Sequence, residues 1–160
     1  MFLTSGNFAT REQMERLDKV ICFRGSYLVY QKPETNEQFA VTCDTPDSVL
    51  DMLSSSGYKN IYSTADLNEV INELPESVLV KIGDTEYTYH PHISHYYNMV
   101  TLELSDIDEE NPYSVLKVFT GERLMDAVVD LIEWIQSSRK GNFIIELPSD
   151  YITNKNQQLS

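Results

Sequence analysis

The longest regular pattern of apolar and polar residues in the chain lies over residues 121–138. Residues 122–137 contain no proline or glycine, and polar side chains occupy the side opposite the apolar stripe. Such a pattern predicts a helix with one buried face and one wet face, and Thr120 is its expected N-cap. The apolar residues at helical spacing are Leu124, Val128, Leu131, Ile132 and Ile135.

Three shorter stretches have the same spacing and predict further helices: 10–22, 45–57 and 66–74. Thr10 and Gln13 form a capping-box pattern at the start of the first. The second is expected to bury a stripe formed by Val49, Leu50 and Leu53. The third is expected to end before Pro75.

Alternating and β-branched stretches predict strands, most of them joined in hairpins. The helices and strands do not alternate regularly enough for a doubly wound parallel sheet. We therefore expect an α+β fold, with three to four helices on a mostly antiparallel sheet and the long helix, at about 121–138, packed on that sheet. The predicted strands cover residues 26–31, 39–42, 60–62, 78–82, 86–89, 99–104, 113–119 and 143–146.

The length of 160 residues suits one core. We expect a single compact domain over residues 1–150, because no change in composition marks a boundary. Residues 151–160 are polar and without periodicity, which predicts a flexible C-terminal tail.

The net charge of the chain indicates which classes of partner it can bind. The chain has 25 acidic and 12 basic residues, for a net charge of −13, and residues 44–110 hold 14 of the acidic and 2 of the basic residues. The phosphates of nucleic acids and of anionic membranes would be repelled by this surface. We therefore expect a basic protein partner, with no direct binding to nucleic acid or membrane.

The compartment expected from the sequence is the cytoplasm. The apolar runs are too short to cross a bilayer, and the N-terminal stretch lacks the basic segment of a secretory signal. Cys22 and Cys43 fit no CxxC pattern, so we expect reduced, buried side chains.

All three histidines fall within residues 90–95. On an extended backbone His90 and His92 would share one face, and His95 could reach back, which is the clustering that a transition-metal site needs. However, the spacing matches no established zinc motif, and Pro91 disrupts regular geometry. We expect no bound metal or cofactor, and a small metal-dependent enzyme centred on these histidines is the alternative.

Other catalytic or metal-binding motifs fail at defined positions. Asp106, Asp108 and Glu110 match the first ligand positions of a calcium loop, but Asn111 replaces its glycine and Lys117 replaces its bidentate glutamate. The sequence contains no G-x-S-x-G, Walker or G-x-G-x-x-G motif. We therefore expect a protein without catalytic residues.

A rigid surface of carboxylates can imitate nucleic-acid phosphates, which carry one charge per roughly 1.7 Å of duplex. Small acidic proteins of this kind inhibit restriction enzymes, CRISPR effectors or DNA-binding regulators, and immunity proteins use similar surfaces against cationic nucleases. We therefore expect a non-enzymatic, phage- or mobile-element-type inhibitor of a basic, nucleic-acid-handling protein. Two other interpretations are a structural subunit of a larger assembly and a surface that is only solvated.

The predicted partner-binding residues combine three groups. One is an acidic row along the outer face of the 66–74 helix, another is the acidic segment 103–110, and the third is a tryptophan at the border of the long helix. The hairpin carboxylates Asp84 and Glu86 add charge nearby. The residues are Asp66, Glu69, Glu73, Glu103, Asp106, Asp108, Glu109, Glu110 and Trp134.

Overall fold

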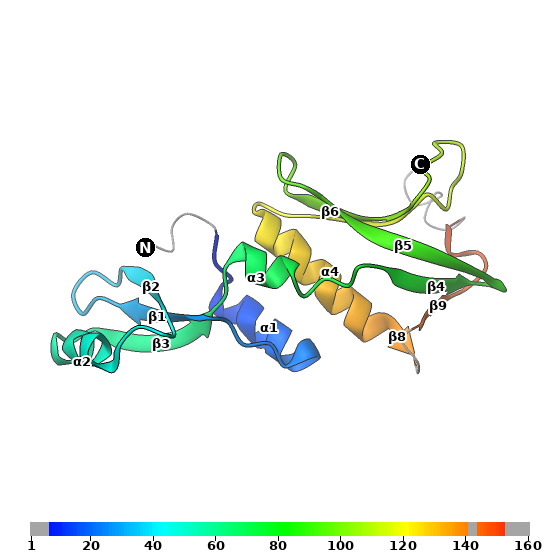
Figure 1. Cartoon of the computed structure of the whole chain (residues 1–160). Coiled ribbons are helices and arrows are strands. Elements are labelled where there is room, and N and C mark those ends of the chain that lie inside the picture. The colour runs from blue at the N-terminus through cyan, green and yellow to red at the C-terminus, as the bar shows by residue number, and fades with distance from the viewer. Residues whose placement is uncertain (1–6, 141–143, 153–160) are drawn as a thin grey trace. The chain divides into compact units, whose positions relative to one another are not determined.

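The structure is a computed structural model that describes residues 7–140 and 144–152 (Figure 1). Contacts divide the chain into two compact units, unit 1 (Met1–Ile71) and unit 2 (Asn72–Ser160). The single compact domain over residues 1–150 stays a prediction. The α+β class is confirmed, because the described residues form helices and two mostly antiparallel sheets.

Unit 1 contains a three-stranded antiparallel sheet in the order β2-β1-β3. The capping box predicted at Thr10 and Gln13 is confirmed, since each side chain bonds to the other residue's backbone N–H, at 3.1 and 2.9 Å. The elements are α1 (Arg11–Ile21), β1 (Tyr27–Gln31), β2 (Gln38–Thr42), α2 (Asp47–Ser55), β3 (Lys59–Thr64) and α3 (Leu67–Ile71).

Two expectations for unit 1 are wrong. No residue of α2 is buried, and Val49 is 37% exposed, because the helix covers the sheet only partly. Both cysteines are free but exposed rather than buried. Cys22 ends α1 in the left-handed conformation, with φ 53°, and this position lies outside the apolar stripe of the helix.

Unit 2 contains a six-stranded sheet in the order β7-β6-β5-β4-β9-β8. Neighbouring strands are antiparallel except β4 and β9, which are parallel. The elements are β4 (Val78–Ile82), β5 (Thr85–Ser94), β6 (Met99–Leu104), β7 (Val115–Thr120), α4 (Leu124–Ser138), β8 (Arg139–Lys140) and β9 (Ile144–Leu147).

The long helix packs on this sheet, as the sequence predicted. Leu131 and Ile135 of α4 join Val80, Tyr89 and Leu102 of the strands in one buried core. The predicted start was early, because the N-cap is Arg123 rather than Thr120, and its N–H donates to the Asp126 carboxylate at 3.1 Å. The predicted end at about residue 138 is confirmed, because α4 ends at Ser138 and Arg139 is its C-cap.

Strand β5 is longer than the sequence indicated. It continues through His90 to Ser94, whereas the predicted strand ended at residue 89, and Pro91 lies opposite Leu102 of β6. Strand β4 begins at Val78, opposite Tyr89, so that Pro91 has a neighbouring strand on only one side. A residue without an N–H is tolerated where one side of the strand is unpaired.

The start of the predicted tail is part of the core. Ile152 is 3% exposed and belongs to the buried cluster of unit 2. Residues 153–160, the rest of the predicted tail, lie outside the described residues.

Candidate functional site

Asp66 and Glu69 cap the short helix α3. The Asp66 carboxylate accepts a hydrogen bond from the Glu69 N–H at 2.9 Å, and the Glu69 carboxylate accepts one from the Asp66 N–H at 2.9 Å. This reciprocal pair satisfies backbone donors that a helix start leaves without acceptors. Both acids therefore have a local structural role.

The same two carboxylates bind the start of β1. Glu69 accepts hydrogen bonds from the backbone N–H of Ser26, at 3.0 Å, and from its hydroxyl. The Tyr27 hydroxyl donates to Asp66 at 3.2 Å. Burial, followed by the charge of Asp66, raises the pKa of Tyr27 above its ordinary value. These bonds fasten α3 to the sheet of unit 1.

Glu73 does not extend this pair into a row. Helix α3 ends at Ile71, and Glu73 is an exposed turn residue assigned to unit 2. The prediction that Asp66, Glu69 and Glu73 line one helix face is therefore wrong. Five residues make little more than one turn, which is too short for three acids at this spacing.

Glu103 lies on β6, opposite His90 of β5, and is bonded within its own sheet. Its side chain accepts a hydrogen bond from the buried Thr101 hydroxyl at 2.8 Å, and its second oxygen lies 3.5 Å from His92 Nδ1. The side chain of Glu103 is 17% exposed. The charge of Glu103 is therefore less accessible to a partner than the charges of the acids in the following loop.

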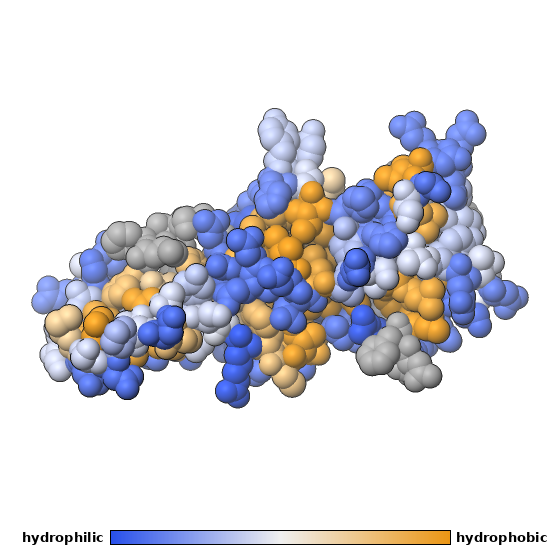
Figure 2. Space-filling view, in the orientation of Figure 1, coloured by the Kyte–Doolittle hydropathy of each residue, from blue (hydrophilic) through white to orange (hydrophobic). Residues whose placement is uncertain are grey.

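The β6–β7 loop, residues 105–114, has a defined conformation. The Ser114 hydroxyl donates to the Asp108 carbonyl at 2.9 Å and accepts from the Asp108 N–H at 3.1 Å. The Asp108 carboxylate accepts from the Glu110 N–H at 3.0 Å. Asp106, Asp108, Glu109 and Glu110 are all exposed, and Figure 2 shows hydrophilic side chains over this loop at the upper right.

Strand order brings further carboxylates to the same end of the sheet. Because β5 is antiparallel to β4 and β6, and β9 is parallel to β4, the β4–β5 turn, the β6–β7 loop and the segment after β9 share one end. The Gly83 N–H donates to the Leu147 carbonyl at 3.1 Å, and the Tyr87 and Tyr113 rings stack at 5.0 Å. These contacts connect the three segments.

We call this group of exposed carboxylates the acidic end. No basic residue in the described parts of the chain forms an ion pair with its members, although Lys81 lies opposite both Glu86 and Glu146 in the strand register. Its residues are Asp84, Glu86, Asp106, Asp108, Glu109, Glu110, Glu146 and Asp150.

Part of this group could not be found from sequence. The hairpin pattern indicated that Asp84 and Glu86 lie at a turn, but nothing placed Glu146 and Asp150 beside them. Their position depends on the parallel pairing of β9 with β4, between segments about 65 residues apart. Periodicity within one segment carries no information on such pairing.

Trp134 is partly buried and packs against the core of unit 2. Its half-buried ring lies 6.4 Å from that of Phe119, and Lys117 Nζ lies 5.5 Å from its centroid. The tryptophan therefore packs against β7, and the ammonium group of Lys117, from the same unit, lies against its ring.

The histidines do not form a three-membered cluster. His90 Nδ1 lies 3.1 Å from the Glu76 carbonyl, His92 contacts Glu103, and His95 is exposed in the following turn. Within residues 7–140 and 144–152, no group of three or more His, Cys, Asp or Glu side chains is arranged to hold a metal ion. The structure supplies no observation that favours the metal-dependent alternative.

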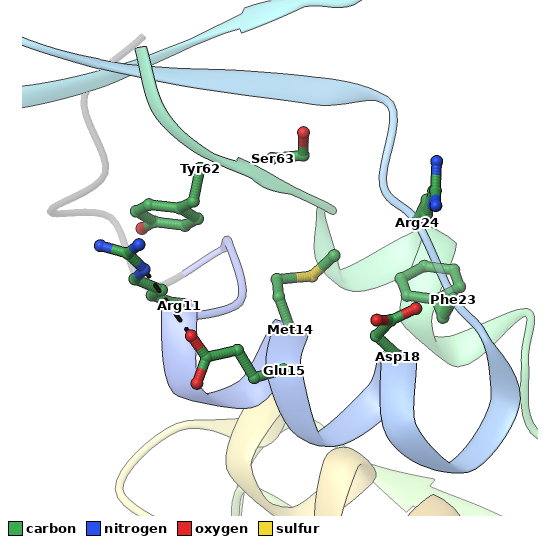
Figure 3. Close-up of a pocket in the computed structure, with 8 residues that line it drawn as sticks. All are labelled: Arg11, Met14, Glu15, Asp18, Phe23, Arg24, Tyr62 and Ser63. Carbon is green, nitrogen blue, oxygen red and sulfur yellow. Dashed lines mark ion pairs between the residues drawn. The ribbon is translucent and has the colours of Figure 1, made fainter. Parts of the chain in front are cut away.

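Unit 1 has a pocket of about 360 Å³ between α1 and β3 (Figure 3). Arg11 Nε lies 3.7 Å from Glu15 Oε1, and both side chains are mostly exposed. Charges of both signs surround the space, so the pocket does not select an anion or a cation. Its lining residues are Arg11, Met14, Glu15, Asp18, Phe23, Arg24, Tyr62 and Ser63.

Comparison with known proteins gives no assignment. No protein-family model, no curated protein and no solved structure matches the chain significantly. Among the described residues, no helix is both long enough and apolar enough to span a bilayer.

Proposed function

We propose that this protein is a non-enzymatic inhibitor that binds a basic, nucleic-acid-handling protein through the acidic end of unit 2. The observation that carries the proposal is the strand order, which gathers eight exposed carboxylates from three separate segments. Their summed field attracts a basic groove, which raises the association rate and disfavours acidic partners. Such an inhibitor occupies the site where the partner binds phosphates.

The β6–β7 loop would contribute affinity as well as charge. Ile107 is 55% exposed in the middle of the acidic segment and offers apolar area to a partner. The bonds between Ser114 and Asp108 hold the loop in one conformation, so binding orders fewer residues and loses less entropy. An apolar anchor surrounded by charge is a common arrangement at protein interfaces.

The residues proposed here to contact the partner differ from those predicted from the sequence. The proposal leaves out Asp66 and Glu69, whose carboxylates are bonded to backbone N–H groups, and Trp134, which packs against Phe119. It also leaves out Glu73, which lies beyond the end of α3, and Glu103, which is bonded within its own sheet. It keeps the four loop acids and adds Asp84, Glu86, Glu146 and Asp150. A protein of this kind suits a phage or mobile element whose host carries basic defence nucleases.

The test is a capture experiment with three immobilised baits and a nuclease-treated lysate, eluted in steps of increasing salt and identified by mass spectrometry. One bait is the wild-type chain. The second carries Asp106→Asn, Glu109→Gln and Glu110→Gln in the acidic end. The third is a matched control with Glu34→Gln, Asp44→Asn and Asp51→Asn, which changes the net charge equally at three exposed positions of unit 1.

We expect the wild-type and control baits to retain a basic nucleic-acid-binding protein that salt releases steeply. We expect the acidic-end variant to release it at lower salt. The purified partner should then lose its nucleic-acid-binding or cleavage activity when the wild-type chain is added. Equal elution from all three baits, or a captured protein that keeps its activity, would contradict the proposal.

A further inference from the structure

Two tyrosines project from the turn between β5 and β6, at the end of β5 opposite the acidic end. Tyr96 is 87% exposed and Tyr97 is 68% exposed, the two highest values among the large apolar side chains of the described residues. Their ring centroids lie 4.8 Å apart with an interplanar angle of 85°. Two rings at a right angle form a corner and leave ring faces open to solvent.

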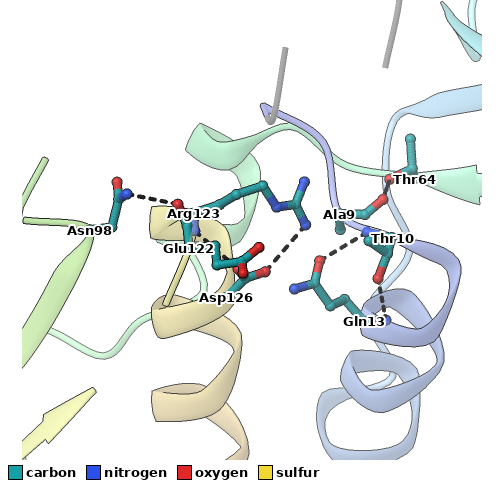
Figure 4. Close-up of polar contacts among 8 residues, drawn as sticks. All are labelled: Ala9, Thr10, Gln13, Thr64, Asn98, Glu122, Arg123 and Asp126. Carbon is teal, nitrogen blue, oxygen red and sulfur yellow. Dashed lines mark hydrogen bonds and ion pairs between the residues drawn. The ribbon is translucent and has the colours of Figure 1, made fainter. Parts of the chain in front are cut away.

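The base of this turn is fixed. Asn98 adopts the left-handed conformation with φ 47°, its side chain donates to the Glu122 carbonyl at 2.9 Å (Figure 4), and its own carbonyl accepts from the Gly121 N–H at 3.2 Å. These bonds tie the turn to the segment that leads into α4. The turn projects from the surface in Figure 2, at the top centre, on an anchored base.

Exposed aromatic rings on a fixed turn are suited to binding a partner's side chain. Nucleic-acid bases could stack on them, but the net charge of −13 repels the phosphates that accompany bases. The face of an aromatic ring carries negative electrostatic potential and attracts cations. Arginine is preferred over lysine because its planar, weakly hydrated guanidinium stacks on a ring.

We propose that the corner formed by Tyr96 and Tyr97 is a docking site for an arginine side chain of a basic protein. This inference rests on the proposed function in one respect, that the partner is basic. The ten residues of β5 span about 30 Å, so the tyrosine corner and the acidic end are separate surfaces that can be tested separately.

The test uses the full chain with ¹³C-labelled tyrosine rings, observed by NMR at low ionic strength. The probe is the peptide acetyl-Gly-Arg-Gly-Arg-Gly-amide. Two matched peptides replace arginine by lysine or by citrulline, which keeps the planar shape of arginine but has no charge. The Tyr96→Phe and Tyr97→Phe variants assign the signals.

We expect the ring signals of Tyr96 and Tyr97 to shift saturably with the arginine peptide, less with the lysine peptide and not with the citrulline peptide. The double variant Tyr96→Leu, Tyr97→Leu keeps apolar area but removes both ring faces. It should bind the arginine peptide about five- to thirtyfold more weakly at the turn, as two cation–π contacts at exposed sites imply. Both side chains are exposed, so this variant should fold normally.

Unmoved tyrosine signals, or equal shifts with citrulline, would overturn the inference. Equal shifts with lysine would overturn the choice of arginine. The variant Asp106→Asn, Glu109→Gln, Glu110→Gln separates this inference from the proposed function. If the tyrosine signals still shift in that variant while its partner capture is unchanged, the acidic end is not the site and the tyrosine corner stands. If partner capture depends on the acidic end but the tyrosine signals never move, the proposed function stands and the arginine docking site is overturned.

Discussion

At the scale of single residues, acids with similar sequence contexts have different roles. Glu69 accepts hydrogen bonds from two backbone N–H groups and one hydroxyl, whereas Glu73, four residues later, is exposed beyond the end of α3. Asp108 lies between these extremes, because its carboxylate accepts one backbone bond and is still exposed. Spacing alone could not separate these cases, since the partner of Glu69 lies 43 residues away at Ser26.

The first prediction concerns Glu69. Replacing Glu69 by Ala removes the acceptor of the Ser26 and Asp66 N–H groups, so we expect the free energy of unfolding to fall by about 1–3 kcal/mol. Urea denaturation followed by circular dichroism measures this change. Glu73→Ala is the control, with an expected change within about 0.5 kcal/mol, as for other surface substitutions. Equal losses in both variants would show that Glu69 is not a structural residue.

The second prediction concerns Tyr89, which is fully buried and donates to the Tyr113 carbonyl at 2.8 Å. Burial raises the pKa of its hydroxyl well above the ordinary value of 10.0. The stabilisation from the neutral hydroxyl is therefore complete below about pH 10, and it is lost as the pH rises toward the folded-state pKa.

Tyr89→Phe should lower the free energy of unfolding at pH 7 by about 1–2 kcal/mol, because the Tyr113 carbonyl loses its donor. Between pH 10 and pH 11.5, about the range where a free tyrosine ionises, the variant should lose less stability than the wild type. Urea midpoints at pH 7 and pH 11.5 measure both effects. The exposed Tyr96, changed to Phe, should leave both midpoints as in the wild type.

At the scale of elements, the β5–β6 turn depends on one residue in the left-handed region. Asn98 tolerates φ 47° better than most residues, and its side chain adds a bond to the Glu122 carbonyl. Gly121, at the other side of this connection, has no space for a side chain, because an added Cβ would lie 2.6 Å from Asp126 Cβ. The turn and the start of α4 are therefore held by the same few contacts.

A pair of substitutions separates the conformation of the turn from its hydrogen bond. Asn98→Gly loses the bond to Glu122 but accepts the positive φ, whereas Asn98→Ala loses the bond and strains the backbone. We expect the alanine variant to be less stable than the glycine variant by about 1 kcal/mol, measured by thermal unfolding. If the glycine variant is the less stable one, the left-handed conformation at position 98 does not determine the stability of this turn.

Elements were predictable where the information is local. The apolar stripe of α4 and the capping box of α1 follow from spacing within a few residues, and both are confirmed. The extension of β5 through Pro91 was not predicted, because it depends on where the neighbouring strand β4 begins. The acidic end was visible only in part for the same reason, since Glu146 and Asp150 reach it through pairing of distant strands.

At the scale of the whole molecule, the charge is unevenly distributed. Of the net charge of −13, the acidic end of unit 2 supplies eight carboxylates in three neighbouring segments. Like charges at this density repel one another, and the folded state keeps them together. This repulsion destabilises the free folded protein. Binding a partner whose positive charges neutralise the acidic end would remove the repulsion.

This repulsion predicts a salt-dependent stability. Neutralising Asp106, Glu109 and Glu110 to their amides should raise the free energy of unfolding at low salt by about 0.3–0.5 kcal/mol, the scale of like-charge neighbour pairs. The gain should shrink at 0.5 M salt, where screening is strong. The control variant Glu34→Gln, Asp44→Asn, Asp51→Asn should gain less, because its charges are more widely spaced along the chain. Equal gains at both salt concentrations would exclude repulsion at the acidic end.

The parallel pairing of β9 with β4 has a consequence for the synthesis of the chain. Strand β9 lies between β4 and β8, and Ile145 is fully buried, yet Ile144–Leu147 follows every other described strand of unit 2 in the sequence. Until it emerges, Val78–Ile82 has an open edge that can pair with another nascent chain. Unit 2 therefore completes its described sheet only after residue 147 has been synthesised, and a premature stop before residue 144 would leave an aggregation-prone fragment.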